Sequence, residues 1–402
     1  MRWIGDYYRF HGHQVSGSDV SNGGHKAENV DGAELVIYTS AITPDNPELN
    51  RAKELGIRVI SRATALGEIE GAFGTSIAVA GTHGKTTVTA MINSALSGRK
   101  VAMHLGGTIK GKNGNTDGEI FLTEACEYKR SFLSLAPTVG VILNVELDHT
   151  DYYSSYAHLM NAFELFAKQS QTLVCPCGYH TFNPRADGRK IEVGATGEYA
   201  LIGYKGKDGE SDLLIKTPDG IQEFHLGVIG KHNAENAVFA VATARVMGVD
   251  YDEIREGLRA FKGVDRRLQL VGKCEGRPLY SDYAHHPTEI KATLSALWTL
   301  GIKNPLIIFQ PHTNERLTAF FDDFIKALST CRTIILPVYN ARGKEAGKTS
   351  EDLSRALSEI GWSACARSFE DGAQIARTLL PRIDCIITMG AGDNEKILPF
   401  LL

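Results

Sequence analysis

The chain has 402 residues, with 43 Lys and Arg against 47 Asp and Glu, which gives a formal net charge of −4. This balance argues against binding to nucleic acid or to anionic membranes through charge alone, and no apolar run reaches the roughly 18 residues that cross a bilayer. The length predicts two to four domains. The first residues lack the apolar segment of a secretory signal, and the seven cysteines are mostly isolated, so we expect reduced thiols and a cytoplasmic protein.

Residues 1–72 form the first of three segments that differ in character. Residues 2–13 are predicted to form a helix of poor amphipathicity, because Arg2, Asp6 and Arg9 stand among its apolar residues. Strand-like runs and one helical run then follow in the order HQVSGSD (strand), ELVIYTSAI (strand), PELNRAKELG (helix) and IRVISRA (strand).

The second segment, 73–263, and the third, 264–402, continue the alternation of strands and helices. The second contains the strand candidates SIAVA, EIFLTEA and TVGVILNV, and a polar stretch over 176–225 whose Asp-Gly pairs at 187–188, 208–209 and 219–220 predict hairpins. The third alternates helices such as EIKATLSALWTL with the strand candidates RPLYSDYA, NPLIIFQPH, RTIILPVY and DCIITMGAGD. This alternation predicts an α/β fold with mostly parallel sheets covered on both faces.

A glycine-rich loop follows the strand SIAVA and precedes the helical run VTAMINSAL. It reads Gly81-Thr82-His83-Gly84-Lys85-Thr86-Thr87 and matches a GxxGKTT pattern, since Val79 stands where the full phosphate-loop pattern has Gly. In such a loop, backbone N–H groups and the helix N-terminus hold phosphate oxygens, the Lys reaches the β- and γ-phosphates and the first Thr joins the Mg²⁺ shell. The plain alternative is a glycine-rich turn before a helix.

Candidate metal ligands follow the next two strands. EIFLT ends at Glu124, and TVGVILNV runs into Glu146, Asp148 and His149. Because ligands bind outside the carboxyl ends of parallel strands, we expect Glu124 and His149 to lie near the glycine-rich loop. Spacing leaves Glu127 and Asp148 open as substitutes, and a solvated strand end and a loop histidine are the plain readings of Glu124 and His149.

Eight motifs together give the chain a resemblance to the Mur ligases. In chain order they are GTHGKTT, TEACEY, LNVELDHTDYY, GKHNAENA, FKGVDRR, SDYAHHPTEI, FQPHTNER and TMGAGD, and they cover nearly the whole sequence. The resemblance implies an incomplete, Rossmann-like UDP-sugar-binding domain over 1–72, a central P-loop ATPase domain over 73–263 and a Rossmann-like C-terminal ligase domain over 264–402. The DYAHHPTEI and FQPH motifs resemble the members that add alanine.

The resemblance implies an ATP-dependent reaction in peptidoglycan precursor synthesis. The carboxylate of UDP-N-acetylmuramate is phosphorylated to an acyl phosphate, and the amine of L-alanine then attacks it. Lys85, Glu124 and His149 are implied as catalytic residues, with Thr86 holding one Mg²⁺ and Glu124 and His149 a second. Two other readings remain open: a non-catalytic relative that binds ATP, and a Mur-type ligase with another substrate.

The resemblance also assigns binding residues outside the loop. The implied ATP-binding residues beyond 81–87 are His232, Asn233, Asn236, Arg267 and Asp282. The implied substrate-binding residues are Asp19, Ser40, His285, His312 and Arg316. An N-cap role for Asn233 and a structural ion pair for Arg266 or Arg267 are the open alternatives.

The remaining features of the sequence give less information about the reaction. The family's first domain begins with a strand and a glycine-rich loop, and residues 2–13 match the helix after that loop, so we expect the chain to lack both. Cys175-Pro-Cys177 with His180 does not have the usual spacing of zinc ligands. Arg342, Lys344 and Lys348 are expected in a solvated loop.

Overall fold

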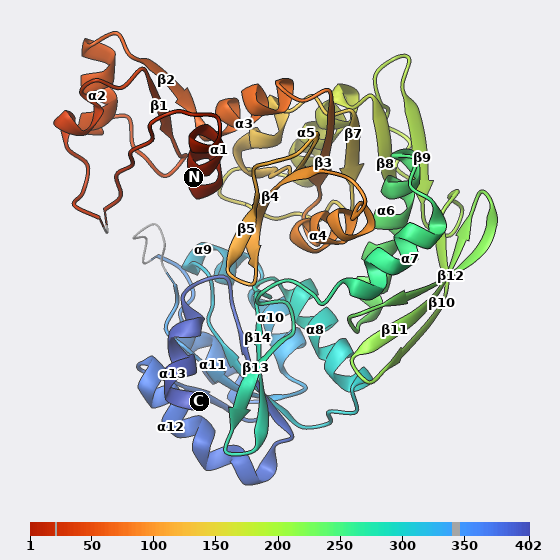
Figure 1. Cartoon of the computed structure of the whole chain (residues 1–402). Helices are drawn as coiled ribbons and strands as arrows, with labels where there is room; N and C mark the ends of the chain where they lie inside the picture. The colour runs from red at the N-terminus through yellow and green to blue at the C-terminus, as the bar shows by residue number, and fades with distance from the viewer. Residues whose placement is uncertain (21, 340–345) are drawn as a thin grey trace.

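The computed structural model describes residues 1–20, 22–339 and 346–402, which form three α/β parts in sequence along the chain (Figure 1). The α/β class with mostly parallel sheets, predicted above, is confirmed. Arg342 and Lys344 lie outside the described residues, whereas the Nζ of Lys348 lies 4.6 Å from the ring centre of Phe321. No helix in the described part of the chain is both long enough and apolar enough to cross a bilayer.

The N-terminal part contains a small parallel sheet of two strands, β1 and β2. Its elements are α1 (Arg2–Phe10), the 3₁₀ turn η1 (Ala27–Val30), β1 (Leu35–Tyr38), α2 (Pro47–Glu54), β2 (Arg58–Ser61) and α3 (Arg62–Gly71). The strand predicted at HQVSGSD is wrong. Asp19 instead begins a turn, in which its carbonyl accepts hydrogen bonds from the N–H groups of Asn22 and Gly24. The Ser, Gly and Asp residues of this run favour turns over strands.

Helix α1 is more amphipathic than the sequence predicted. Trp3, Ile4 and Tyr7 share one face and are buried against the central part of the molecule. The indole N–H of Trp3 donates to the carbonyl of Asn115 at 3.0 Å. The polar residues of the helix therefore occupy its other face, and the prediction of poor amphipathicity is wrong.

A mostly parallel sheet of seven described strands forms the central part, in the order β5-β4-β6-β3-β7-β8-β9, with β5 antiparallel to β4. Its strands are β3 (Thr75–Ala80), β4 (Val101–Ile109), β5 (Lys112–Asn115), β6 (Ile120–Glu124), β7 (Val139–Ile142), β8 (Thr172–Pro176) and β9 (Arg189–Val193). Its helices are α4 (Lys85–Ala95), α5 (Tyr156–Gln169), α6 (Lys231–Val246) and α7 (Tyr251–Ala260), with the 3₁₀ segment η2 (Tyr128–Ser134).

Both faces of this sheet are covered, as the buried strand β3 requires. Ile77 and Val79 pack in one core with α4, α6 and α7, whereas Ala78 and Ala80 pack in the opposite core with α1, α3 and α5. Side chains alternate across a strand, so one short apolar run serves two helix layers. The arrangement fixes the carboxyl end of β3, where the glycine-rich loop begins.

The polar stretch over 176–225 forms hairpins only in its second half. Strands β10 (Ala200–Lys207), β11 (Glu210–Thr217) and β12 (Gly220–Leu226) form an antiparallel sheet whose turns hold the Asp-Gly pairs at 208–209 and 219–220. The hairpin predicted at 187–188 is wrong, because that pair lies between β8 and β9, which are parallel.

The C-terminal part is a sheet of six described strands in the order β13-β14-β18-β15-β16-β17, with only β13 and β14 antiparallel. The strands are β13 (Gln269–Cys274), β14 (Arg277–Asp282), β15 (Pro305–Phe309), β16 (Arg332–Ile335), β17 (Ser363–Cys365) and β18 (Cys385–Met389). The helices are α8 (Pro287–Thr299), α9 (Asn314–Ala319), α10 (Phe321–Leu328), α11 (Ser350–Ser358), α12 (Phe369–Leu379) and α13 (Leu398–Leu401), with 3₁₀ turns η3 (Leu380–Arg382) and η4 (Asn394–Ile397). Figure 1 shows this part below the central part.

Candidate active site

The glycine-rich loop connects β3 to α4, as predicted. Gly84 caps α4 with a φ of 86°. The backbone angle favours glycine, and the space is also tight, because a Cβ at that position would lie 3.0 Å from the Oδ1 of Asn236. The same contact brings α6, which carries Asn236, beside the loop.

Lys85 is the first residue of α4, and its side chain turns toward the loop. The Nζ donates to the carbonyls of Gly81 and Thr82 and to the carboxylate of Glu127 at 2.9 Å. Burial alone lowers the pKa of Lys85, but the neighbouring Glu127 outweighs burial and raises it. Lys85 is therefore a positive charge that Glu127 and two carbonyls hold at the N-terminus of α4.

Thr86 and Glu124 lie in contact beside Lys85. The Thr86 hydroxyl donates to Glu124 Oε2 at 3.0 Å, and the Gly106 N–H donates to Glu124 Oε1 at 2.6 Å. The two side chains offer a hydroxyl and a carboxylate oxygen, which are the donor atoms that Mg²⁺ prefers. The donor set fits this ion.

His149 contacts Glu127 in this structure. Its Nε2 lies 3.5 Å from Glu127 Oε1, and Glu127 is buried between His149 and Lys85. The predicted metal ligands thus occur as two neighbouring pairs, Thr86 with Glu124 and His149 with Glu127. The substitute that the sequence left open, Glu127, is part of the group.

Three of the predicted ATP-binding residues, His232, Asn233 and Asn236, lie in the first part of α6. Gly230, not Asn233, caps this helix, and the Asn233 amide donates to the Ile229 carbonyl at 2.7 Å, so the N-cap reading of Asn233 is wrong. Burial and the charge of Arg267 lower the pKa of His232 to about 4. A neutral imidazole can both donate and accept a hydrogen bond, as contact with a base edge requires.

Arg266, Arg267 and Asp282 lie where the central and C-terminal parts join. Arg267 Nη1 lies 3.4 Å from Glu289. Arg266 donates to the carbonyls of Gly390 and Gly392 and to the side chain of Asn394. Its Nε also lies 3.5 Å from Glu395, which is the kind of contact that the ion-pair alternative expects. The Asp282 carboxylate accepts the N–H groups of Leu268 and Ala284, both at 2.7 Å.

Arg316 crosses from the C-terminal part to the central part. Its guanidinium donates to both oxygens of Asp148, at 2.7 and 2.9 Å, and the two side chains are only 10% and 8% exposed. Its Nη1 lies 3.0 Å from His312 Nδ1. Burial raises the pKa of Asp148, but the charge of Arg316 outweighs burial and holds that pKa far below its usual range.

A further set of side chains surrounds His83 at the same junction. His83 Nε2 lies 3.1 Å from Glu146 Oε2, and its Nδ1 lies 3.5 Å from Glu289 Oε1. Burial alone lowers the pKa of His83, but these two carboxylates raise it to about 9. Glu289 also lies 3.1 Å from His285 Nδ1. His83 and His285, both predicted site residues, therefore share one buried carboxylate.

Asp19 and Ser40, the predicted contacts to the sugar nucleotide, are exposed in the N-terminal part and lie outside these groups. Sequence reasoning missed Glu289. The available signal was its place three residues after His286, where its carboxylate completes a capping box at the start of α8. It also missed the role of Thr288, whose hydroxyl donates to Glu146 at 2.7 Å.

A glycine-rich phosphate loop between a buried parallel strand and a helix, facing a second α/β domain, defines a P-loop nucleotide-binding protein. Three family models match the chain: the Mur ligase family catalytic domain over 4–73, the Mur ligase middle domain over 79–244 and the Mur ligase glutamate ligase domain over 266–392. The chain belongs to the Mur ligase family.

Curated relatives match the chain over most of its length. The UDP-N-acetylmuramate–L-alanine ligase of Acetivibrio thermocellus is 36% identical over 420 residues, which span 96% of this chain and 90% of the relative. The ligase of the same name from Caldicellulosiruptor bescii is 38% identical over 94% of this chain and 87% of its own length. Among solved structures, UDP-N-acetylmuramate-alanine ligase MurC of Thermotoga maritima covers 97% of this chain and 88% of its own, with a TM-score of 0.78 at 24% identity.

Proposed function

We propose that this chain joins L-alanine to the carboxyl group of UDP-N-acetylmuramate at the expense of ATP, in peptidoglycan precursor synthesis. The observation that carries the proposal is the meeting of the phosphate loop with the DYAHHPTEI motif, in which His83 lies 3.5 Å from Glu289. The relatives named above support the choice of substrates. The reaction would take place in the cytoplasm, and the seven free cysteines fit a reducing compartment.

The roles follow from the charges at the loop. A carboxylate becomes an acyl donor only when one of its oxygens becomes a leaving group, so phosphorylation comes first. Lys85, held by Glu127, offsets the charge of the phosphoryl group in transfer. The N–H groups of the loop and of the first turn of α4 hold the phosphates, and we assign this role to residues 81–87.

Thr86, Glu124 and His149 are the proposed ligands of Mg²⁺. The hydroxyl–carboxylate contact of Thr86 with Glu124 supports the first two, and His149 lies at the same edge of the sheet, next to Glu127. When bound, Mg²⁺ supplies positive charge that draws phosphate and carboxylate together.

The remaining assignments concern binding. We assign His232, Asn233, Asn236, Arg267 and Asp282 to ATP, Asp19 and Ser40 to the sugar nucleotide, and His285, His312 and Arg316 to the reacting carboxylate and amine. We place the domain boundaries at 72/73 and 263/264, between α3 and β3 and between α7 and β13.

The test is phosphate release that requires both UDP-N-acetylmuramate and L-alanine, with Lys85→Ala as the decisive variant. Removing the held charge is expected to lower turnover by about 10²–10³-fold. Lys168→Ala, an exposed lysine on α5, is the matched control and is expected to keep full turnover. Folded wild-type protein that releases no more phosphate than Lys85→Ala overturns the proposal. ATP binding that persists in that sample favours a non-catalytic relative.

A second prediction concerns the metal. Glu124→Ala and His149→Ala are each expected to raise the Mg²⁺ concentration that gives half-maximal turnover, because each removes a proposed ligand. Titration of Mg²⁺ at saturating ATP measures this concentration. An unchanged magnesium requirement in both variants contradicts the assignment and points to Glu127.

A further inference from the structure

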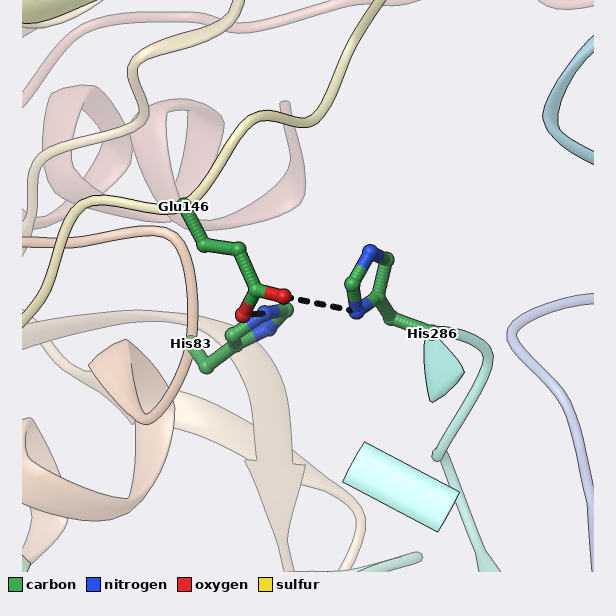
Figure 2. A group of neighbouring side chains, drawn as sticks. All are labelled: His83, Glu146 and His286. Carbon is green, nitrogen blue, oxygen red and sulfur yellow. Dashed lines mark hydrogen bonds and ion pairs between the residues drawn. The ribbon is translucent and has the colours of Figure 1, made fainter. Parts of the chain in front are cut away.

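Two histidines and a glutamate from three separated stretches of sequence meet at the junction of the central and C-terminal parts. They are His83 of the phosphate loop, Glu146 after β7, and His286 at the N-cap of α8 (Figure 2). One ligand atom from each lies within 4.8 Å of the others. Figure 2 shows the Glu146 carboxylate with one oxygen toward each imidazole ring.

The contacts around the three side chains hold them in this arrangement. Glu146 Oε2 lies 3.1 Å from His83 Nε2, and Glu146 Oε1 lies 3.9 Å from His286 Nδ1. The other nitrogen of His83, Nδ1, faces Glu289 at 3.5 Å. A carboxylate on the far nitrogen of a histidine is the usual outer contact of a metal-binding imidazole, since it fixes the ring and makes it a better ligand.

His286 adds a second observation. The residue is buried, and its Nε2 has no hydrogen-bond partner in the described part of the chain. Its Nδ1 accepts the Thr288 N–H at 3.3 Å as the helix cap. The nitrogen that faces Glu146 is Nδ1, at 3.9 Å, and its hydrogen bond with the Thr288 N–H is long, so Nδ1 is the atom that can serve as a ligand.

From these contacts we propose that His83, Glu146 and His286 form a binding site for a transition-metal dication of the Zn²⁺ type, separate from the Mg²⁺ site at Thr86 and Glu124. Two imidazoles and one carboxylate are a ligand set that zinc favours and magnesium does not. Tetrahedral zinc ligands stand about 3.4 Å apart, so movements of about 1 Å bring the three atoms into place.

The three ligands come from two different domains. A metal bound to His83 and Glu146 on one side and to His286 on the other links the central and C-terminal domains in the arrangement seen here. Zinc at this site therefore stabilises this arrangement of the two domains against their separation.

The experiment measures binding of Zn²⁺ to the full chain by calorimetry, without nucleotide and with Mg²⁺ in excess, so that hard-cation sites are filled. One Zn²⁺ per chain is expected. His286→Asn is expected to weaken binding at least tenfold, because loss of an outer contact alone costs about 10–100-fold. Asn keeps an N-cap acceptor for α8. Glu146→Gln, of the same shape, is the second variant, should His286→Asn fail to fold.

His180→Gln is the matched control. His180 is exposed and lies near Cys175 and Cys177, where a competing zinc site could form. The dissociation constant of the His180→Gln variant for Zn²⁺ is expected to equal that of the wild type. Wild-type protein that takes up no Zn²⁺, equal affinity in His286→Asn and Glu146→Gln, or a loss confined to His180→Gln each overturns the proposal. Binding is read directly, so the outcome is independent of ligase activity.

Discussion

The central domain has two neighbours, and it contacts them through different chemistry. Helix α1 packs on one side through aromatic rings: Trp3 lies 5.6 Å from Phe121 and 5.1 Å from His104, centre to centre. The C-terminal domain is joined on the other side by charged and polar groups, including Asp148 with Arg316. The first contact is mainly aromatic, and the second is ionic.

The α1 contact is suited to a permanent attachment, whereas the contacts of the C-terminal domain can be exchanged for others. Apolar burial is non-directional and offers nothing to an anionic ligand. The ionic contacts use guanidinium and carboxylate groups, which also pair with phosphates and carboxylates of small molecules. We expect α1 to stay attached to the central domain throughout the reaction, while the C-terminal domain changes its contacts.

The largest expected effect is that of Trp3→Ala, which removes the anchor of α1. A fully buried Trp replaced by Ala loses about 3–5 kcal/mol, and Trp3 is 1% exposed. The urea midpoint of the central domain should fall accordingly, and amide exchange in α1 should become fast. Trp298→Ala, at a tryptophan that is 49% exposed, is the control and should change little. Equal effects of the two substitutions contradict the anchoring role.

Asp148→Asn tests the ionic contact and should have the next largest effect. Breaking a buried ion pair costs about 3–5 kcal/mol, and the residual exposure of this pair places the expected loss at about 2–3 kcal/mol. A double-mutant cycle with Arg316→Met measures the coupling, because the second substitution should add little to the first. Glu253→Gln breaks an exposed pair with Arg99 and is the control, expected to cost less than about 1 kcal/mol. Additive losses at Asp148 and Arg316 would show that the pair is not coupled.

The two contacts were not equally predictable from the sequence. The strand, loop and helix at residues 76–95 are determined by the local sequence. Glu124 contacts Thr86 because β3 and β6 are parallel neighbours and end at the same edge of the sheet. The face of α1 was misjudged because its partners, Phe121 and Asn115, lie more than a hundred residues away.

Contacts between domains were not predicted, because their partners also lie far apart in the sequence. Glu289 carries a local signal as part of a capping box. Its approach to His83 depends on how two domains pack, which no periodicity encodes. The pairing of Asp148 with Arg316, 168 positions apart, is likewise a property of the assembled molecule.

The smallest of the three effects comes from His104, the titratable group inside the aromatic contact. Burial and the charge of Arg62 lower its pKa to about 3, against about 6.5 in an unfolded chain. The unfolded chain therefore binds the extra proton first, so stability is complete above pH 6.5 and falls as the pH drops toward 3. At pH 5 the loss from this group is about 2 kcal/mol.

His104→Asn removes the titrating imidazole, so a comparison with the wild type measures how much His104 contributes to the pH dependence of stability. The variant starts less stable at neutral pH, because it loses the contacts of the ring with Trp3 and Thr123, but its urea midpoint should fall less between pH 7.5 and pH 5 than that of the wild type. Parallel pH profiles for the two proteins would mean that His104 does not contribute to the acid sensitivity. A steeper wild-type profile would assign the difference to His104, and the acid sensitivity that remains in the variant would belong to other buried histidines, since burial also lowers the pKa of His232 and His286 to about 4.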